Sequence, residues 1–165
     1  MTGWIPEAAT RIAARAEREL EALVAVSSPS GDVHGAEEAL SVCVALLPDE
    51  AELERLECSS PEHARDLLAR VPGRGRGRVL LLGHVDTVVA HEDHQPLRRE
   101  GDRLIGSGAV DMKGGVVLAL GVLRHLAARP DHFAEAALLL VCDEEWRNVP
   151  LAHVDRFAGW DACLC

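Results

Sequence analysis

Two short apolar runs in this chain each stop at residues that can bind a metal ion. The run over residues 78–82 is followed by His84 and Asp86, and the run over 135–142 is followed by Asp143, Glu144 and Glu145. Short apolar runs bounded by glycine or polar residues predict buried strands. A rigid sheet holds polar groups at its strand ends in fixed positions, while the loops beyond leave room for a substrate. The sequence therefore predicts a buried sheet with a functional site at one edge.

The remaining segments alternate with these strands. We expect helices over residues 6–26, 33–47 and 111–128, a short helix over 151–157, further strands over 51–58 and 161–165, and a hairpin over 97–105, whereas 64–71 fits either a helix or a strand. Strands that alternate with helices indicate an α/β domain of three layers, in which helices flank a mixed, largely parallel sheet. Functional groups then lie at the carboxyl ends of the strands.

Charge and composition exclude several kinds of partner. The net charge is −10, and nucleic acid binding needs clustered Lys and Arg, so we expect no nucleic-acid partner. The absence of a run of about 18 apolar residues predicts no membrane partner, and the absence of a signal peptide predicts a cytoplasmic protein. None of the cysteines forms a CxxC pair, and apolar neighbours predict buried free thiols; they are Cys43, Cys58, Cys142, Cys163 and Cys165.

His84 is the first candidate metal ligand. A histidine that binds a metal usually donates its other ring N–H to a carboxylate, which fixes the tautomer and the ring orientation. Asp86 is close enough in sequence for this orienting role. Alternatively, Asp86 caps backbone N–H groups of a turn.

Asp111 is the second candidate. It follows a glycine-rich turn and opens the predicted helix, so the simplest interpretation is that it serves as the N-cap. Its two oxygens could also bridge two cations about 3.5–4 Å apart. The chain's only lysine, Lys113, lies in the same motif, which suggests that this position requires a lysine.

A phosphate-binding loop is the alternative for this glycine-rich segment. A P-loop needs glycine before its lysine and Ser or Thr after it, but Met112 and Gly114 flank Lys113. A dinucleotide fingerprint would need glycine where Asp111 stands. Both tests fail, so a phosphate-binding protein is the weakest hypothesis.

Three adjacent carboxylates close the second apolar run. Asp143, Glu144 and Glu145 repel one another unless a cation or hydrogen-bond donors compensate them. A solvated acidic loop is the simplest interpretation. Beside His84 and Asp111, we instead expect one glutamate to bind a metal and its neighbour to exchange a proton with the attacking water.

The motifs GHVDTV, GSGAVDMKGG and DEE, in this order, resemble the M20 family of zinc metallopeptidases and amidohydrolases, over about residues 27–165. The resemblance implies the N-terminal portion of a zinc-exopeptidase-type catalytic domain, spanning residues 1–165, with two Zn²⁺ ions, or Co²⁺ or Mn²⁺ in their place. It implies that His84, Asp111 and Glu145 are metal ligands, with Asp111 bridging both ions. It also implies that Asp86 orients His84 and that Glu144 is the general base.

The implied reaction is the hydrolysis of a small peptide or an N-acyl amino acid. The family's remaining ligands, and a lid domain through which the parent protein would dimerise, would lie beyond residue 165. The family usually has small residues after the acidic triplet, whereas this chain has Trp146 and Arg147, and the bulky Trp146 could reshape the pocket wall. The alternative is a truncated or degenerate module that keeps the fold with an incomplete metal site and catalyses nothing.

Overall fold

A five-stranded mixed sheet forms the centre of the protein in a computed structural model, which describes residues 3–165. Its strands lie in the order β1 (Glu52–Leu56), β2 (Asp66–Pro72), β6 (Glu135–Val141), β3 (Arg78–His84) and β7 (Ala162–Leu164). β3 pairs in parallel with both β6 and β7, whereas β2 is antiparallel to β1 and β6. Four strands therefore run in one direction and only β2 opposes them, which confirms the predicted mixed α/β sheet.

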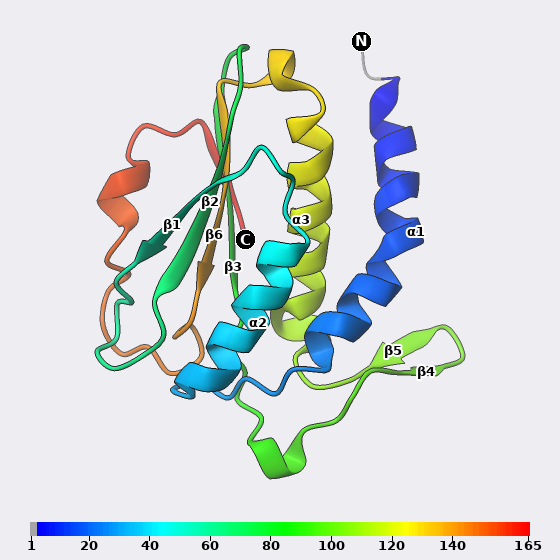
Figure 1. The fold of residues 1–165 in the computed structure, drawn as a ribbon, viewed down its shortest axis with the longest axis vertical. Helices are drawn as coiled ribbons and strands as arrows, with labels where there is room; N and C mark the ends of the chain where they lie inside the picture. The colour runs from blue at the N-terminus through cyan, green and yellow to red at the C-terminus, as the bar shows by residue number, and fades with distance from the viewer. Residues whose placement is uncertain (1–2) are drawn as a thin grey trace.

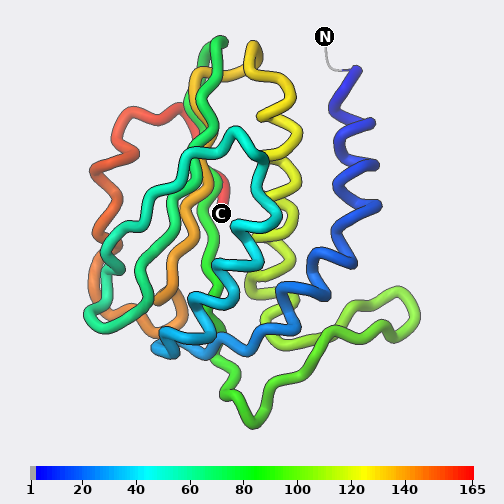
Figure 2. The backbone as a smooth tube through the Cα atoms, viewed as in Figure 1, coloured from blue at the N-terminus to red at the C-terminus, as the bar shows by residue number. Residues whose placement is uncertain are grey.

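The two faces of the sheet are covered differently. Helices α1 (Trp4–Val24), α2 (Val33–Ala45) and α3 (Gly114–Ala127) lie on one face, and the segment that carries the short helix η4 (Val154–Phe157) lies on the other (Figures 1 and 2). This arrangement gives the three expected layers. No helix within residues 3–165 is both long enough and apolar enough to span a membrane.

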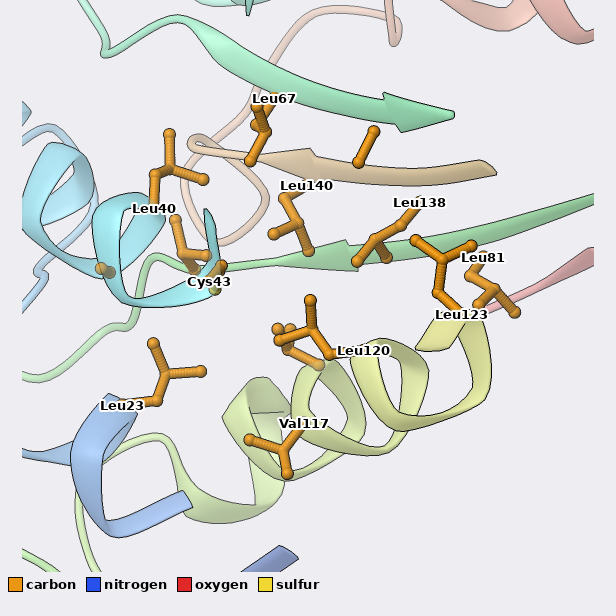
Figure 3. Packing of buried hydrophobic residues seen from close by; sticks show 14 of the residues in the cluster. Leu23, Leu40, Cys43, Leu67, Leu81, Val117, Leu120, Leu123, Leu138 and Leu140 are labelled. Atoms are coloured by element: carbon orange, nitrogen blue, oxygen red, sulfur yellow. The ribbon is translucent and has the colours of Figure 1, made fainter. Parts of the chain in front are cut away.

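Strand β6 contributes to the cores on both faces. Leu138 and Leu140 pack with Leu120 and Leu123 of α3 in the larger cluster (Figure 3), while Leu139 points to the smaller cluster on the opposite face. Side chains alternate along a strand, so a strand that is buried on both faces reads as an unbroken apolar run. The predicted strand over 135–142 is therefore confirmed with nearly the expected bounds.

Local signals in the sequence also place the first two helices. The breaker before the second helix ends in Asp32, whose carboxylate Oδ2 accepts a hydrogen bond from the backbone N–H of Gly35 at 2.8 Å. An aspartate at this position satisfies an N–H that has no partner inside the helix. The helices expected over 6–26 and 33–47 are both present, each ending two residues early.

The segment over 64–71, which the sequence left open, is a strand. β2 lies between β1 and β6 and is hydrogen-bonded to both. The hairpin is formed by β4 (Arg98–Glu100) and β5 (Arg103–Ile105). Short helices η1 (His91–Asp93) and η3 (Pro130–His132) complete the connections.

The third helix begins later than predicted. Residues Ala109–Lys113 form an irregular turn, η2, and Asp111 has extended angles of φ −121° and ψ 101°. The N-cap of α3 is Lys113, so the expectation that Asp111 caps this helix is wrong. The extended backbone at Asp111 instead allows its carboxylate to turn away from the helix.

The prediction of buried thiols is only partly correct. All five cysteines are free; Cys43 and Cys142 are buried, but Cys163 and Cys165 are exposed. β7 lies at the edge of the sheet, and all three of its residues are exposed. An apolar sequence in an edge strand therefore did not produce burial.

Candidate metal centre

The candidate site lies where β3 and β6 end side by side. His84 is the last residue of β3 and pairs in register with Val141, the last residue of β6. Glu144 and Glu145 follow β6 by three and four residues. Parallel neighbours deliver their carboxyl ends to one edge, which brings two distant segments together.

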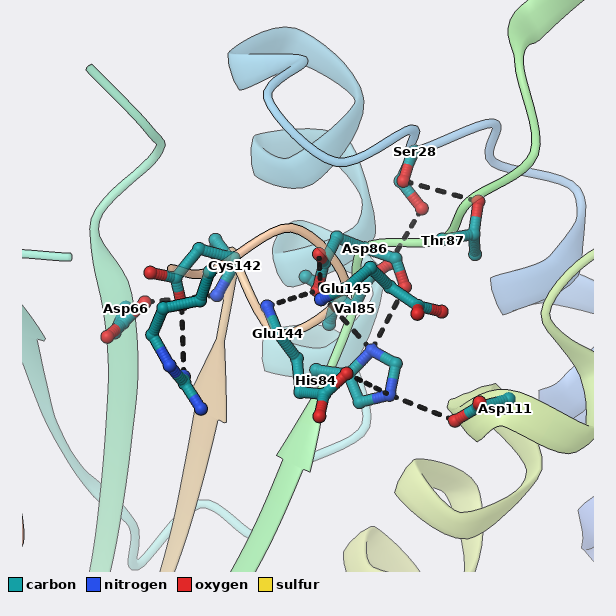
Figure 4. Close-up of polar contacts among 12 residues, drawn as sticks. Ser28, Asp66, His84, Val85, Asp86, Thr87, Asp111, Cys142, Glu144 and Glu145 are labelled. Atoms are coloured by element: carbon teal, nitrogen blue, oxygen red, sulfur yellow. Dashed lines mark hydrogen bonds and ion pairs between the residues drawn. The ribbon is translucent and has the colours of Figure 1, made fainter. Parts of the chain in front are cut away.

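The structure also brings the third segment to this edge. Ligand atoms of His84, Asp111 and Glu145 all lie within 4.8 Å of one another. His84 Nε2 is 3.1 Å from Asp111 Oδ1 and 3.9 Å from Glu144 Oε2 (Figure 4). His84 is buried, Glu145 is half-buried, and the carboxylates of Asp111 and Glu144 are exposed. The cluster is thus anchored in the sheet and open to solvent.

Asp86 is buried and contacts both His84 and the backbone of the two glutamates. The Nδ1 atom of His84 lies 3.0 Å from the Asp86 carbonyl oxygen and 3.3 Å from its Oδ1. The two carboxylate oxygens of Asp86 also accept hydrogen bonds from the backbone N–H groups of Glu144, at 3.2 Å, and Glu145, at 3.1 Å. Asp86 therefore contacts both the ring that it would orient and the turn that carries the two glutamates.

Electrostatic interactions among these groups are strong. Burial alone would lower the pKa of His84, but hydrogen bonds and charge from Asp86, together with Asp111, outweigh it and raise the pKa to about 9. Burial would raise the pKa of Asp86, but the hydrogen bonds from His84 and the Glu145 backbone, together with the charge of His84, lower it. The pKa of Glu145 is raised, first by burial and then by neighbouring carboxylates. Excess negative charge at this edge would favour a bound cation.

The glycine-rich turn before Asp111 passes close to Thr87, and this approach requires a glycine at position 108. Gly108 has a positive φ of 70°, and a Cβ atom there would lie 2.7 Å from Thr87 Cγ2. Only glycine fits such a conformation and contact without strain. Lys113 is buried, and its Nζ donates a hydrogen bond to the Val26 carbonyl at 2.7 Å. The lysine thus ties this turn to the segment that follows α1.

Residues 28 and 29 hold the segment after His84 in place, and these contacts could not be predicted from the sequence. Ser28 Oγ donates to the Val85 carbonyl at 2.7 Å, and the Thr87 N–H donates to the Ser28 carbonyl at 2.9 Å. Pro29 forms an isolated bridge with Thr87. The sequence indicated only a chain breaker here, because nothing in it shows which distant backbone a serine will meet.

A pocket of about 260 Å³ opens beside the cluster. His84, Asp111 and Glu144 line it, and so does Arg147. Trp146, which was expected to form its wall, is 60% exposed and is not among the lining residues. Of the two residues that follow Glu145, Arg147 rather than Trp146 therefore lines this pocket.

The donor set fits a divalent cation. Zn²⁺ binds imidazole nitrogen and carboxylate oxygen, and carboxylates also suit Mn²⁺. His84 Nδ1 already faces Asp86, which leaves Nε2 toward Asp111. A ring whose second nitrogen is held by a carboxylate is the usual form of a metal-binding histidine.

Comparison with known proteins shows the family of the chain. Residues 80–161, which contain all five candidate residues, match Peptidase family M20/M25/M40. The chain belongs to this family. Succinyl-diaminopimelate desuccinylase from Xanthomonas campestris pv. campestris is 36% identical over 140 residues, covering 74% of this chain and 36% of that protein. The corresponding enzyme from Halorhodospira halophila is 40% identical over 107 residues, covering 55% of this chain and 28% of its own length.

Solved structures show the same fold. Human carnosine dipeptidase 1 superimposes with a TM-score of 0.75 at 20% identity, over 97% of this chain and 40% of that one. A di-peptidase from Saccharomyces cerevisiae gives a TM-score of 0.69 at 16% identity, over 88% of this chain and 36% of that one. The match to this M20 chain therefore spans between 28% and 40% of the length of each relative described.

Proposed function

We propose that this chain is part of a metal-dependent hydrolase that cleaves an amide or peptide bond, as an exopeptidase or an N-acyl amino acid deacylase. The observation that carries the proposal is the convergence of His84, Asp111 and Glu145 within 4.8 Å beside a pocket. The similarity to succinyl-diaminopimelate desuccinylases supports the same class of reaction. The substrate is a small peptide or an N-acyl amino acid.

In this proposal His84, Asp111 and Glu145 would hold Zn²⁺, with Co²⁺ or Mn²⁺ as substitutes, and Asp111 would serve as a ligand to both of two ions. A bound divalent cation supplies Lewis acidity, which acidifies a water molecule and polarises the scissile carbonyl. Asp86 keeps the ring of His84 in one orientation and holds the turn of the two glutamates through its contacts at 3.1–3.3 Å.

Glu144 is the proposed general base. Its carboxylate lines the pocket and is 3.9 Å from His84 Nε2, while its backbone N–H is fixed by Asp86. A base must lie within reach of the proton that it removes. Glu144 would take a proton from the attacking water and return it to the leaving amine.

We further propose that residues 1–165 are the N-terminal portion of the catalytic domain. The chain covers 36% of the Xanthomonas relative, so other segments of a longer protein would supply the remaining ligands, the lid domain and the dimer contacts. A non-catalytic module with an incomplete site is the competing possibility, and it predicts weak metal binding and no turnover.

Metal binding and hydrolysis test the proposal together. We expect Zn²⁺ to raise the melting temperature of the chain, because a ligand at 100 times its Kd stabilises the folded state by about 2.7 kcal/mol. Asp111→Asn should remove most of this shift, whereas Asp102→Asn, in the exposed hairpin turn, should keep it. Zn²⁺-dependent release of amino acid from N-acyl substrates should accompany the shift. Unchanged melting with Zn²⁺ and no hydrolysis would favour the non-catalytic module.

A further inference from the structure

The pocket beside the metal cluster combines an apolar wall with one arginine. Arg147 is the only Arg or Lys among the described residues that line this pocket of about 260 Å³. The apolar part of the lining comes from Leu82, Met112, Val141 and Leu151. A pocket of this kind suits a short aliphatic group that carries a negative charge.

Arg147 is held at one end only. Its NH1 lies 3.3 Å from Asp143 Oδ1, and Asp143 is fully buried with its Oδ2 accepting a hydrogen bond from the Ser60 N–H at 2.9 Å. Within residues 3–165, the structure pairs Arg147 with Asp143 alone. A guanidinium has five N–H donors in a fixed fork, so this contact leaves donors for a second carboxylate.

The charge of the site is compatible with such a group. Asp111 and Glu144 line the same pocket, and Glu145 lies beside them. The divalent cations of the proposed function would compensate these carboxylates, so they would not exclude an anionic substrate. Arg147 supplies a permanent positive charge within the pocket, because arginine is not deprotonated in proteins.

We propose that Arg147 is a specificity-determining residue that binds a carboxylate of the substrate, while buried Asp143 fixes the position of its guanidinium. The inference rests on the proposed hydrolase function and assigns recognition of a substrate carboxylate to this arginine. The carboxylate belongs either to the acyl group, as in a dicarboxylic acyl chain, or to the amino acid that is released. Both sources share one chemistry, and substrates that carry only one of them separate the two.

Three amides test the proposal with the metal-loaded chain. N-succinyl-L-alaninamide carries only an acyl carboxylate, N-butyryl-L-alanine carries only an α-carboxylate, and N-butyryl-L-alaninamide carries neither. Arg147→Gln should lower kcat/KM for one carboxylate substrate by roughly ten- to hundredfold, the size of a lost hydrogen bond to a charged group. The neutral amide should change by less than threefold. Equal losses for all three amides, or no loss for any, would overturn the proposal.

Two further variants separate recognition from folding. Arg147→Lys keeps a cation opposite Asp143 but loses the planar fork, so it should fold normally and show an intermediate loss for the same substrate. Arg156→Gln is the matched control, because Arg156 pairs with Glu54 on the surface, outside the pocket lining. It should leave the ratio between the carboxylate and neutral substrates unchanged.

A binding measurement keeps the inference testable if the chain hydrolyses nothing. The Nε–H NMR resonance of Arg147, assigned by its loss in Arg147→Lys, is followed during titration with N-methylsuccinamate, hippurate or N-methylbutyramide. One of the two anions should shift this resonance and the neutral amide should not. Hydrolysis that fails while this shift is present would count against the proposed function alone. An Arg147 resonance that responds to neither anion would refute the arginine's role, whatever the chain hydrolyses.

Discussion

Replacing Asp86 by asparagine removes one acceptor from the most connected group of the site. Both carboxylate oxygens of Asp86 accept backbone N–H groups, from Glu144 at 3.2 Å and Glu145 at 3.1 Å. The asparagine amide has one oxygen and one NH₂ group, so one of the two backbone donors would face another donor. Asp86 is 1% exposed, and water cannot easily replace the lost acceptor.

The magnitude follows from that one lost contact. An unsatisfied buried donor costs about 1–3 kcal/mol, and a domain of this size loses roughly 2–4 °C in Tm per kcal/mol. We therefore expect Asp86→Asn to lower the Tm of the metal-free chain by about 2–12 °C. Loss of the carboxylate that orients a metal-binding histidine should also weaken Zn²⁺ binding by about 10–100-fold.

Thermal unfolding followed by circular dichroism, with and without Zn²⁺, measures both effects. Asp102→Asn makes the same chemical change at an exposed hairpin position and serves as the control. If Asp86→Asn melts within about 1 °C of the unchanged chain, and Zn²⁺ produces the same shift in both, Asp86 neither holds the glutamate turn nor orients His84.

Three other outcomes are expected. Glu144→Gln should lower turnover at least about 100-fold and leave the zinc content unchanged, because a general base contributes about that factor or more; loss of zinc would exchange the roles of the two glutamates. Leu139→Ala, at a fully buried position of β6, should cost about 2–5 kcal/mol of unfolding free energy, and denaturant titration measures it. In the folded chain at pH 8, the exposed Cys163 and Cys165 should react with iodoacetamide, whereas Cys43 should not. Cys43 is fully buried, and burial raises its pKa to about 12. Mass mapping that finds Cys43 modified first would contradict this.

The elements with a strong local signal were predictable from the sequence. The apolar run that forms β6 is buried on both faces, so it had no polar alternation to obscure it. Asp32 indicated the start of α2, because an N-cap side chain bonds to a backbone N–H within one helical turn and so depends on local sequence alone. The segment that became β2 was ambiguous, since its strand state depends on two distant partners, β1 and β6.

The three motifs in the sequence predicted which residues belong to the candidate centre. The family resemblance of those motifs implied a role for each residue. Tertiary structure alone decided how they meet. The double hydrogen bonding of Asp86 to the turn after β6 and the contact between His84 and Asp111 join segments 27 or more residues apart. The pocket likewise combines Arg147 with the end of β3 and with Asp111. Local sequence sets backbone preferences within a turn or two, whereas these contacts exist only once β3 and β6 pair in parallel and bring their ends together.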